Sequence, residues 1–484
     1  MQKKMWTVCT ECHGQGKINR GLTKKAQRRY KMELAEYEKS ASTDNPPVAP
    51  KAHLHVCSNC SGSGLIQSQT LPEPDYNYPH VAIIGAGIGG VALAVACLHR
   101  GIPFTIYERD DHFNARSQGY GLTLQQASKA IKGLGITSLD GVISTRHVVH
   151  NTEGKILGEW GIRKWMDSKH EMPAKQTNIH IARQSLRMAL LEQLDANTVN
   201  WGHQLIDLSE SENQIELNFQ FNGQIKKSKA DLVVGADGIR SAVRKLVIGD
   251  TRTPLRYLDC IVILGICPLS ALEEIESPLL DSATVFQTAN GNERIYMMPY
   301  DKESVMWQLS FPMSEDEAKK LSAQGPTALK EEALRRTQWH SPIPQILQAT
   351  HEKLISGYPV YDRELTDRVT LQKNEKVTLI GDAAHPMSPF KGQGANQALL
   401  DALKLARKIL KGCNARSKWK EFGIRDRVLN DFEAEMLERS AVKVKDSADA
   451  AQFLHSEIVL HEGDEPRGRN KKTKIKTSFY ILVF

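Results

Sequence analysis

The sequence predicts an α/β fold: a small four-cysteine module precedes a parallel sheet covered by helices, with an inserted antiparallel sheet and helices toward the C-terminus. Three observations lead to this prediction. Two cysteine motifs of identical spacing stand near the start, and from Val81 to Asp110 a strand, a glycine-rich turn, a helix and a second strand follow one another. From Arg256 to Pro312, apolar and polar residues alternate as in the strands of an antiparallel sheet.

The N-terminal motifs are two copies of the pattern CxxCxGxG, CTECHGQG at residues 9–16 and CSNCSGSG at residues 57–64. Each CxxC can point two thiolates at one metal ion, and the glycines give the backbone freedom to turn its N–H groups toward sulfur. The predicted ligands of a tetrahedral Zn2+ site are Cys9, Cys12, Cys57 and Cys60. A redox or disulfide pair is the alternative. The pattern resembles the zinc-binding domain of J-domain chaperones, which has four copies, so it implies metal binding without a chaperone role.

A helix is expected between the two motifs, over residues 22–39. Four residues share its apolar face: Ala26, Tyr30, Leu34 and Tyr37. Its many basic residues would suit a protein partner or RNA. Charge runs are usually solvated, however, so a solvated helix that closes the loop between the motifs is the favoured interpretation.

The stretch from Val81 to Asp110 has the order of a dinucleotide-binding βαβ unit. Gly85 permits the tight turn, Gly87 lets the backbone approach a pyrophosphate, and Gly90 lets the helix lie close on the strand. The helix N-terminus offers free N–H groups to the phosphates. Glu108 stands 23 residues after Gly85, at the end of the second strand, and can accept hydrogen bonds from a ribose hydroxyl.

Two later stretches repeat the pattern of a strand that ends in a polar turn. In ADLVVGADGIRSAVR, at residues 230–244, the turn holds Asp237, which by itself could be only a helix cap. In KVTLIGDAAHPMSPFKGQGANQALLDALKLA, at residues 376–406, a strand ends at Asp382 and a helix begins at about Ala395. A second helix N-terminus would therefore point at whatever Asp382 touches. His385, in the same loop, is interpreted as structural.

These three stretches resemble, in the same order, the three fingerprints of the single-component FAD-dependent monooxygenases with the para-hydroxybenzoate hydroxylase fold. The resemblance covers about residues 80–410. It implies a Rossmann-like FAD-binding domain, with an inserted antiparallel-sheet substrate domain that roofs the flavin. The expected domain limits are 1–70 for the zinc module, 71–79 for a linker, 80–150, 178–250 and 365–412 for the FAD-binding domain, 151–177 and 251–364 for the substrate domain, 413–460 for C-terminal helices and 461–484 for a basic tail.

The resemblance also implies roles for residues at the flavin. The adenosine half of FAD would be held by Gly85, Gly87, Gly90 and Glu108. Arg183, at the start of an amphipathic helix expected over 179–194, would lie along the cofactor, and Asp237 would serve both FAD and the nicotinamide reductant. Asp382 would hold the ribityl and pyrophosphate region. The residues expected to edge the isoalloxazine ring are Pro389, Gly392, Gly394 and Asn396.

The expected activity is that of a flavoprotein monooxygenase that uses NAD(P)H, with NADPH not distinguished from NADH, and O2. Reduced FAD would form a C4a-hydroperoxide, which transfers one oxygen atom to a small substrate, aromatic or polyketide-like. The sequence assigns no catalytic base. A non-oxygenating reductase on the same fold and a zinc-dependent binding protein with a vestigial flavin domain are the alternatives. Pocket walls or plain core are the two interpretations of five strand residues: Phe286, Met297, Met298, Trp307 and Phe311.

Composition limits the other possibilities. The net charge of +7 looks like a sign of nucleic-acid binding, but six of these charges lie in residues 466–484, so the body is nearly neutral and nucleic acid is not an expected partner. No apolar run reaches the roughly 18 residues of a membrane span, and the N-terminus lacks an apolar signal segment. A cytoplasmic protein is expected, with a possible protein partner for the zinc module and a disordered tail from Glu462 onward.

Overall fold

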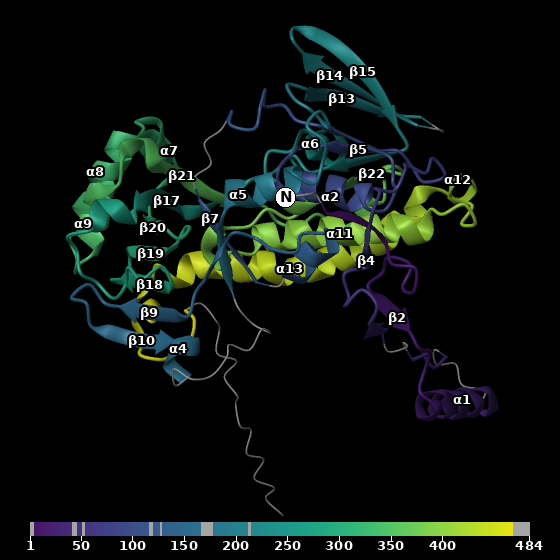
Figure 1. Cartoon of the computed structure of the whole chain (residues 1–484), viewed down its shortest axis with the longest axis horizontal. Helices are drawn as coiled ribbons and strands as arrows, with labels where there is room; N and C mark the ends of the chain where they lie inside the picture. Colours follow the sequence, from purple (N-terminus) through teal and green to yellow (C-terminus); the bar gives the residue numbers. More distant parts are fainter. Residues whose placement is uncertain are drawn as a thin grey trace, which may run out of the picture. The chain divides into compact units, whose positions relative to one another are not determined.

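A computed structural model describes residues 4–40, 46–50, 54–115, 120–125, 128–165, 178–211 and 214–467 of the chain (Figure 1). The chain folds into two compact units. The first comprises residues 1–141, 181–256 and 361–444, and the second comprises residues 142–180, 257–360 and 445–484.

A five-stranded parallel sheet forms the centre of the first unit. In spatial order its strands are β12 (Val199–Asn200), β6 (Phe104–Tyr107), β5 (Val81–Ile84), β16 (Leu232–Gly235) and β22 (Val377–Leu379). All four residues of β5 and of β16 are buried, which explains their continuous apolar sequences, because helices cover both faces of a parallel sheet. The α/β class predicted from the sequence is thus confirmed.

Two helices of this unit, α2 (Ile88–Leu98) and α11 (Gly394–Gly412), pack against each other (Figure 1). Nine of the eleven residues of α2 are buried, so this helix is apolar on every side. The remaining helices that begin in the first unit are α1 (Lys24–Lys39), α3 (Ser128–Gly133), α5 (Arg183–Leu191), α6 (Ala242–Ile248), α10 (Arg368–Leu371), α12 (Trp419–Phe422) and α13 (Asn430–Phe453).

The other strands of the first unit form small sheets. An antiparallel meander consists of β13 (Gln204–Glu210), β14 (Ile215–Phe221) and β15 (Gln224–Ala230). In the N-terminal module, β1 (Met5–Val8) pairs with β4 (Leu65–Ser68), and β2 (Lys17–Asn19) pairs with β3 (Leu54–Val56). A further strand, β7 (Gly121–Leu124), follows α2 and β6 in the chain.

A buried ion pair anchors α13 to the parallel sheet. Arg425, just before the helix, donates from Nη1 to Oε2 of Glu433 over 2.7 Å, and the hydroxyl of Thr378 in β22 donates to Oε1 over 2.8 Å. Glu433 is fully buried and Arg425 is 3% exposed. The pair therefore has little contact with solvent, so its hydrogen bonds must balance the cost of burying the charges.

The second unit contains a seven-stranded sheet in the order β10-β9-β18-β19-β20-β17-β21. Its strands are β9 (Arg146–His150), β10 (Ile156–Trp160), β17 (Arg256–Pro268), β18 (Thr284–Ala289), β19 (Arg294–Pro299), β20 (Ser304–Pro312) and β21 (Ile355–Asp362). The short strands β8 (Val142–Ile143) and β11 (Ile179–Ala182) pair separately. The helices are α4 (Ile162–Trp165), α7 (Glu315–Ala323), α8 (Pro326–Arg336) and α9 (Ile343–Ala349).

The core of this unit contains four of the five strand residues that could have been pocket walls. Phe286, Met297, Trp307 and Phe311 belong to one buried apolar cluster, together with residues of α7, α8 and α9. Met298 is also buried, at 2% exposure. The structure therefore favours the plain-core interpretation for the first four.

Two expectations about secondary structure and order were wrong. Residues 179–182 form β11 instead of the first turn of a helix, because the β-branched alternation Ile-His-Ile suits a strand, and His180 and Ile179 pair with β8. The segment expected to be disordered from Glu462 onward is packed as far as Arg467: the N–H of Gly463 donates to the carbonyl of Leu157 in the edge strand β10 over 2.9 Å. The apolar end of the tail lies outside the described residues.

Candidate functional site

The three fingerprints follow three neighbouring parallel strands. β5 lies between β6 and β16, and β22 lies beside β16. Because the strands are parallel, Gly85, Asp237 and Asp382 leave the sheet at the same edge, each one to three residues after its strand. The carboxyl ends of strands in an open α/β sheet form the usual ligand crevice of this architecture.

The glycine turn after β5 has the geometry that a pyrophosphate site needs. Gly85 has a φ of +104°, where a side chain would be strained, and a Cβ on Gly90 would lie 1.9 Å from the carbonyl oxygen of Gly85. Gly87 differs from both, since a Cβ there would meet nothing within 4 Å. The turn is thus closed on the sheet side and open at Gly87, directly before the N-terminus of α2.

Glu108 closes the turn from the end of β6. Its Oε2 accepts a hydrogen bond from the N–H of Ala86 over 2.7 Å, and its Oε1 accepts one from Asp110 over 3.1 Å. Arg187, which sequence reasoning missed, holds the other side of the turn: its Nε donates to the carbonyl of Ala86 over 2.7 Å, and its guanidinium lies 5.6 Å from the ring centre of Trp201. Only the amphipathic spacing of its helix drew attention to this segment.

Asp237 acts as a cap for α6. Its Oδ2 accepts from the N–H groups of Ala242 and Val243 over 2.7 and 3.2 Å, and its Oδ1 accepts from the hydroxyl of Ser241 over 2.5 Å. Burial raises the pKa of this carboxyl, although these hydrogen bonds oppose the shift. The side chain is fully used by its own helix, and a Cβ on Gly85 would lie only 2.8 Å from its Cα.

A second residue missed from the sequence, Arg244, joins the second fingerprint to the third. It is 2% exposed, and its Nη1 donates to the carbonyls of Ala383 and Ala384 over 2.9 and 3.2 Å. Its Nη2 donates to the hydroxyl of Thr253 over 2.5 Å. The loop that carries Asp382 is therefore fixed from α6.

Asp382 lies at the N-terminus of α11. A Cβ on Gly394, the first residue of the helix, would be 3.5 Å from Oδ1 of Asp382. The carboxylate is exposed, whereas Gly381 and Ala383 on either side are buried. Arg183 interacts electrostatically with Asp382, and its backbone N–H donates to the carbonyl of Tyr120 over 3.1 Å. Predicted cofactor residues from two distant segments are thus brought together.

The first turn of α11 is tied to β7 by Asn396. Its Nδ2 donates to the carbonyls of Thr123 and Gly392, both over 2.8 Å, and its Oδ1 accepts from the N–H of Gln125 over 2.9 Å. Gly392 has a φ of +57° and ends the short turn that begins at Pro389. Asn396 is 1% exposed, so its side chain positions the backbone of this turn.

His385 lies in the protein core behind Asp382. Its Nε2 is 2.6 Å from Oδ2 of Asp401, and both side chains are fully buried. The other carboxylate oxygen of Asp401 accepts from Nη2 of Arg439 over 2.5 Å. Burial opposes ionisation of Asp401, but the contacts with His385 and Arg439 keep the pKa of its carboxyl below the ordinary value. This network supports the structural interpretation of His385.

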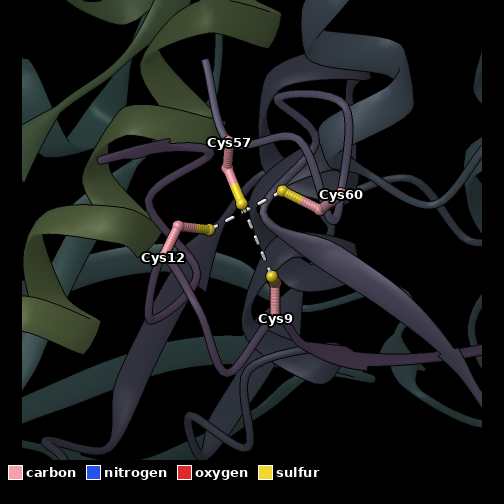
Figure 2. Close-up of side chains that lie close together, drawn as sticks. All are labelled: Cys9, Cys12, Cys57 and Cys60. Atoms are coloured by element: carbon pink, nitrogen blue, oxygen red, sulfur yellow. Dashed lines mark hydrogen bonds between the residues drawn. The ribbon is translucent and has the colours of Figure 1, made fainter. Parts of the chain in front are cut away.

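The four cysteines of the N-terminal module converge on one point (Figure 2). Their sulfur atoms all lie within 4.8 Å of one another, with 3.9 Å between Cys9 and Cys57 and 3.6 Å between Cys12 and Cys60. The four thiols are free and at most 8% exposed. A tetrahedral ion with metal–sulfur bonds of about 2.3 Å would place the sulfurs about 3.8 Å apart, so the set fits such an ion.

The glycines of the two motifs support this centre symmetrically. The N–H of Gly16 donates to Sγ of Cys12 over 3.1 Å, and the N–H of Gly64 donates to Sγ of Cys60 over 3.2 Å. Burial opposes ionisation of Cys60, but hydrogen bonds from Gly64 and the neighbouring thiols lower its pKa to about 7. By contrast, burial raises the pKa of Cys97 to about 12, as expected for a small apolar residue.

The module is packed on the helices of the parallel sheet. Nη2 of Arg407 in α11 donates to the carbonyls of Ser63 and Gly62, over 2.6 and 3.3 Å, and Nε2 of Gln15 donates to the carbonyl of Arg407 over 3.1 Å. Arg100, two residues after α2, is 3% exposed and donates to the carbonyl of Ala96 over 2.9 Å. Burial lowers the pKa of Arg100 to about 9.

Together, the parallel sheet, the open glycine turn and the second helix N-terminus define a dinucleotide-binding protein of the flavoprotein class. The chain belongs to the FAD binding domain family, which it matches over residues 78–419. It is 26% identical over 395 residues to the 3-amino-4-hydroxybenzoate 2-monooxygenase of Streptomyces cremeus, an alignment that covers 81% of this chain and 91% of the relative. It is 24% identical over 339 residues to the 6-hydroxynicotinate 3-monooxygenase of Bordetella bronchiseptica, covering 68% and 82%.

Solved structures share the fold. Klebsiella pneumoniae HpxO, solved with FAD and uric acid, matches with a TM-score of 0.65 and 20% identity over 78% of this chain and 89% of that one. The 2,6-dihydroxypyridine-3-hydroxylase of Arthrobacter nicotinovorans matches with a TM-score of 0.64 and 18% identity, covering 81% and 99%. The fold is therefore that of the para-hydroxybenzoate hydroxylase type, and the protein is an FAD-dependent monooxygenase. Among its described helices, none is long and apolar enough to cross a membrane.

Proposed function

We propose that this monooxygenase uses NAD(P)H and O2 to insert one oxygen atom into a small aromatic substrate. The observation that carries the proposal is the meeting of three fingerprints at one edge of the parallel sheet, in a chain whose relatives are named for hydroxylating an aminohydroxybenzoate and a hydroxynicotinate. Bound FAD would supply the chemistry that the side chains lack, accepting electrons from the reductant and activating O2. The chain would bind the cofactor, orient it and exclude water.

The residues of the site divide this work. The open backbone at Gly87 and the N-terminus of α2 would receive the pyrophosphate, and Glu108 would accept from ribose hydroxyls. Asp382 would accept from the ribityl chain or pyrophosphate. The first turn of α11, held by Asn396, would place N–H groups near the ring, where they stabilise negative charge on the reduced cofactor.

Oxygen balance tests the proposed reaction. The purified protein is incubated with NADPH or NADH, and with 3-amino-4-hydroxybenzoate and 6-hydroxynicotinate as probe substrates. We expect O2 consumption equal to NAD(P)H oxidation and, with 18O2, one labelled oxygen atom in the product of an accepted substrate. NAD(P)H oxidation that reduces an organic acceptor without consuming O2 would instead establish the reductase alternative.

We further propose that the four cysteines bind one Zn2+ ion. The sulfur spacing, the two N–H donors to sulfur and the burial of all four thiols support a closed structural site. Elemental analysis should give one zinc per chain, and a thiol-blocking reagent should fail to label these cysteines until a chelator is added. Protein purified with two disulfides and no metal would establish the redox alternative.

The proposed compartment is the cytoplasm, where the four thiols would stay reduced. The proposed binding surface for a protein partner is α1, which has no buried residue. Cross-linking from a cysteine introduced at Arg28 in α1 tests this, with one placed at the exposed Lys420 as control. Equal labelling of proteins from both positions would contradict it.

A further inference from the structure

Two buried arginines lie beside the four-cysteine centre without a carboxylate partner. Arg100 and Arg407 each interact electrostatically with Cys12, and each repels the other. Within the described residues, neither forms an ion pair with an aspartate or glutamate. In each case the Nε atom is buried and makes no hydrogen bond to any described residue. Two unpaired cations at close range are costly to bury, so their position calls for an anion.

The cysteine centre can supply this anion only when it holds a metal. Four neutral thiols carry no charge, whereas a divalent ion bound to four thiolates has a net charge of −2, since binding releases the thiol protons. That charge equals the combined +2 of Arg100 and Arg407. Glu11 is the nearby acid, 3.5 Å from Sγ of Cys57, and contacts the other motif edge.

The two arginines belong to the two helices whose N-termini face the proposed flavin site. α2 begins at Ile88 beside the open glycine turn, and Arg100 follows its last residues. α11 begins at Gly394 beside Asp382, and Arg407 stands on its fourth turn. The helices also pack against each other. The module therefore contacts the far ends of the helices that would hold the pyrophosphate and edge the flavin ring.

We propose that Arg100 and Arg407 are the counter-charges of the metal–thiolate centre, and that metal binding at this centre strengthens FAD binding through α2 and α11. The inference rests on the proposed zinc site. Without metal, repulsion between the arginines loosens the ends of both helices. With metal, Arg407 holds the second motif by its carbonyls while its charge is neutralised, and the two helix N-termini are fixed for the cofactor.

Thermodynamic linkage makes the proposal measurable. If zinc raises the affinity for FAD by some factor, FAD must raise the affinity for zinc by the same factor. The Kd for FAD is measured by flavin fluorescence on the full chain, first loaded with ZnCl2 and then depleted with a chelator. The Kd for zinc is measured with a chromogenic chelator, with and without FAD. We expect both ratios to be about 10-fold, within the range usual for coupled sites.

Variants of α11 separate charge from structure. Arg407→Met should weaken zinc binding about 10-fold and reduce the coupling to less than about 2-fold, whereas Arg407→Lys, which keeps the charge, should restore most of both. The control is Lys408→Met on the same helix, since Lys408 pairs with the exposed Asp431 and does not contact the module. It should match the wild type in both measurements.

The outcomes distinguish the two levels of the proposal. Failure of the wild-type chain to bind zinc would remove the zinc site itself. Zinc binding with an unchanged Kd for FAD would leave the zinc site standing and overturn the coupling. Wild-type values for Arg407→Met, or no recovery in Arg407→Lys, would overturn the assignment of Arg407 as a counter-charge.

Discussion

Gly87 and Gly90 lie in the same turn, but alanine should affect them in opposite ways. A Cβ on Gly87 meets nothing within 4 Å, and its φ of −73° suits any residue, so Gly87→Ala should fold normally without FAD. A Cβ on Gly90 would lie 1.9 Å from the carbonyl oxygen of Gly85. This atom is part of the backbone, and it cannot move away without opening the turn.

The structure gives a magnitude for each change. In Gly90→Ala, alanine gains about 1 kcal/mol of helix propensity, but overpacking against a backbone atom costs about 3 kcal/mol. The net loss of about 2 kcal/mol should lower the Tm of the FAD-free protein by about 4 °C. In Gly87→Ala, the added methyl group occupies the space through which a pyrophosphate would approach. We expect at least a tenfold weaker Kd for FAD, about 1.4 kcal/mol.

Two measurements check this pair of changes. Thermal unfolding of the FAD-free proteins gives the effect on the fold, and flavin fluorescence titration gives the Kd for FAD. The reasoning is refuted if Gly87→Ala lowers the Tm as much as Gly90→Ala does, or if Gly87→Ala binds FAD as tightly as the wild type.

Three further predictions concern other parts of the chain. Asp382→Ala should purify without FAD, as its absorbance spectrum would show; full occupancy would contradict the role proposed for Asp382. Cys57→Ser should lose zinc, measured by elemental analysis, whereas Ser58→Ala in the same motif should keep one ion per chain; retained zinc in Cys57→Ser would count against the site. Glu433→Gln should lower the free energy of unfolding by about 3 kcal/mol, because it leaves the buried Arg425 uncompensated. In denaturant titration, Glu435→Gln at an exposed pair should cost less than about 1 kcal/mol, and equal losses would disprove this account.

Much of the fold could be predicted because local pattern and tertiary structure agree. The apolar run Val81–Ile84 is buried on both sides, and the residue type at Gly85 is dictated by its positive φ, so a short window of sequence contains the whole argument. The cysteine centre could be anticipated for the same reason, since each motif builds half of it locally. Duplicate spacing then indicated that the halves meet.

The residues that were missed act across long sequence separations. Arg187 holds the carbonyl of Ala86, and Arg244 holds the loop after Asp382, 139 residues away along the chain for its bond to Ala383. An arginine on an amphipathic helix gives no sign of which distant carbonyl it will meet. Residues 462–467 were misjudged likewise, because their order comes from the edge strand β10 and not from their own composition.

The two cysteine motifs brace each other through their main chains. The N–H of Cys9 donates to the carbonyl of Gly64 over 2.9 Å, and the N–H of Cys57 donates to the carbonyl of Gly16 over 3.1 Å. The geometry of the centre is therefore set at the bases of the motifs, and α1 between them contributes none of it. Doubling the length of such a connection costs only about 0.6 kcal/mol of closure entropy. The α1 segment is thus the natural place to splice in a foreign domain, such as a fluorescent reporter whose signal would follow metal loading in the intact enzyme.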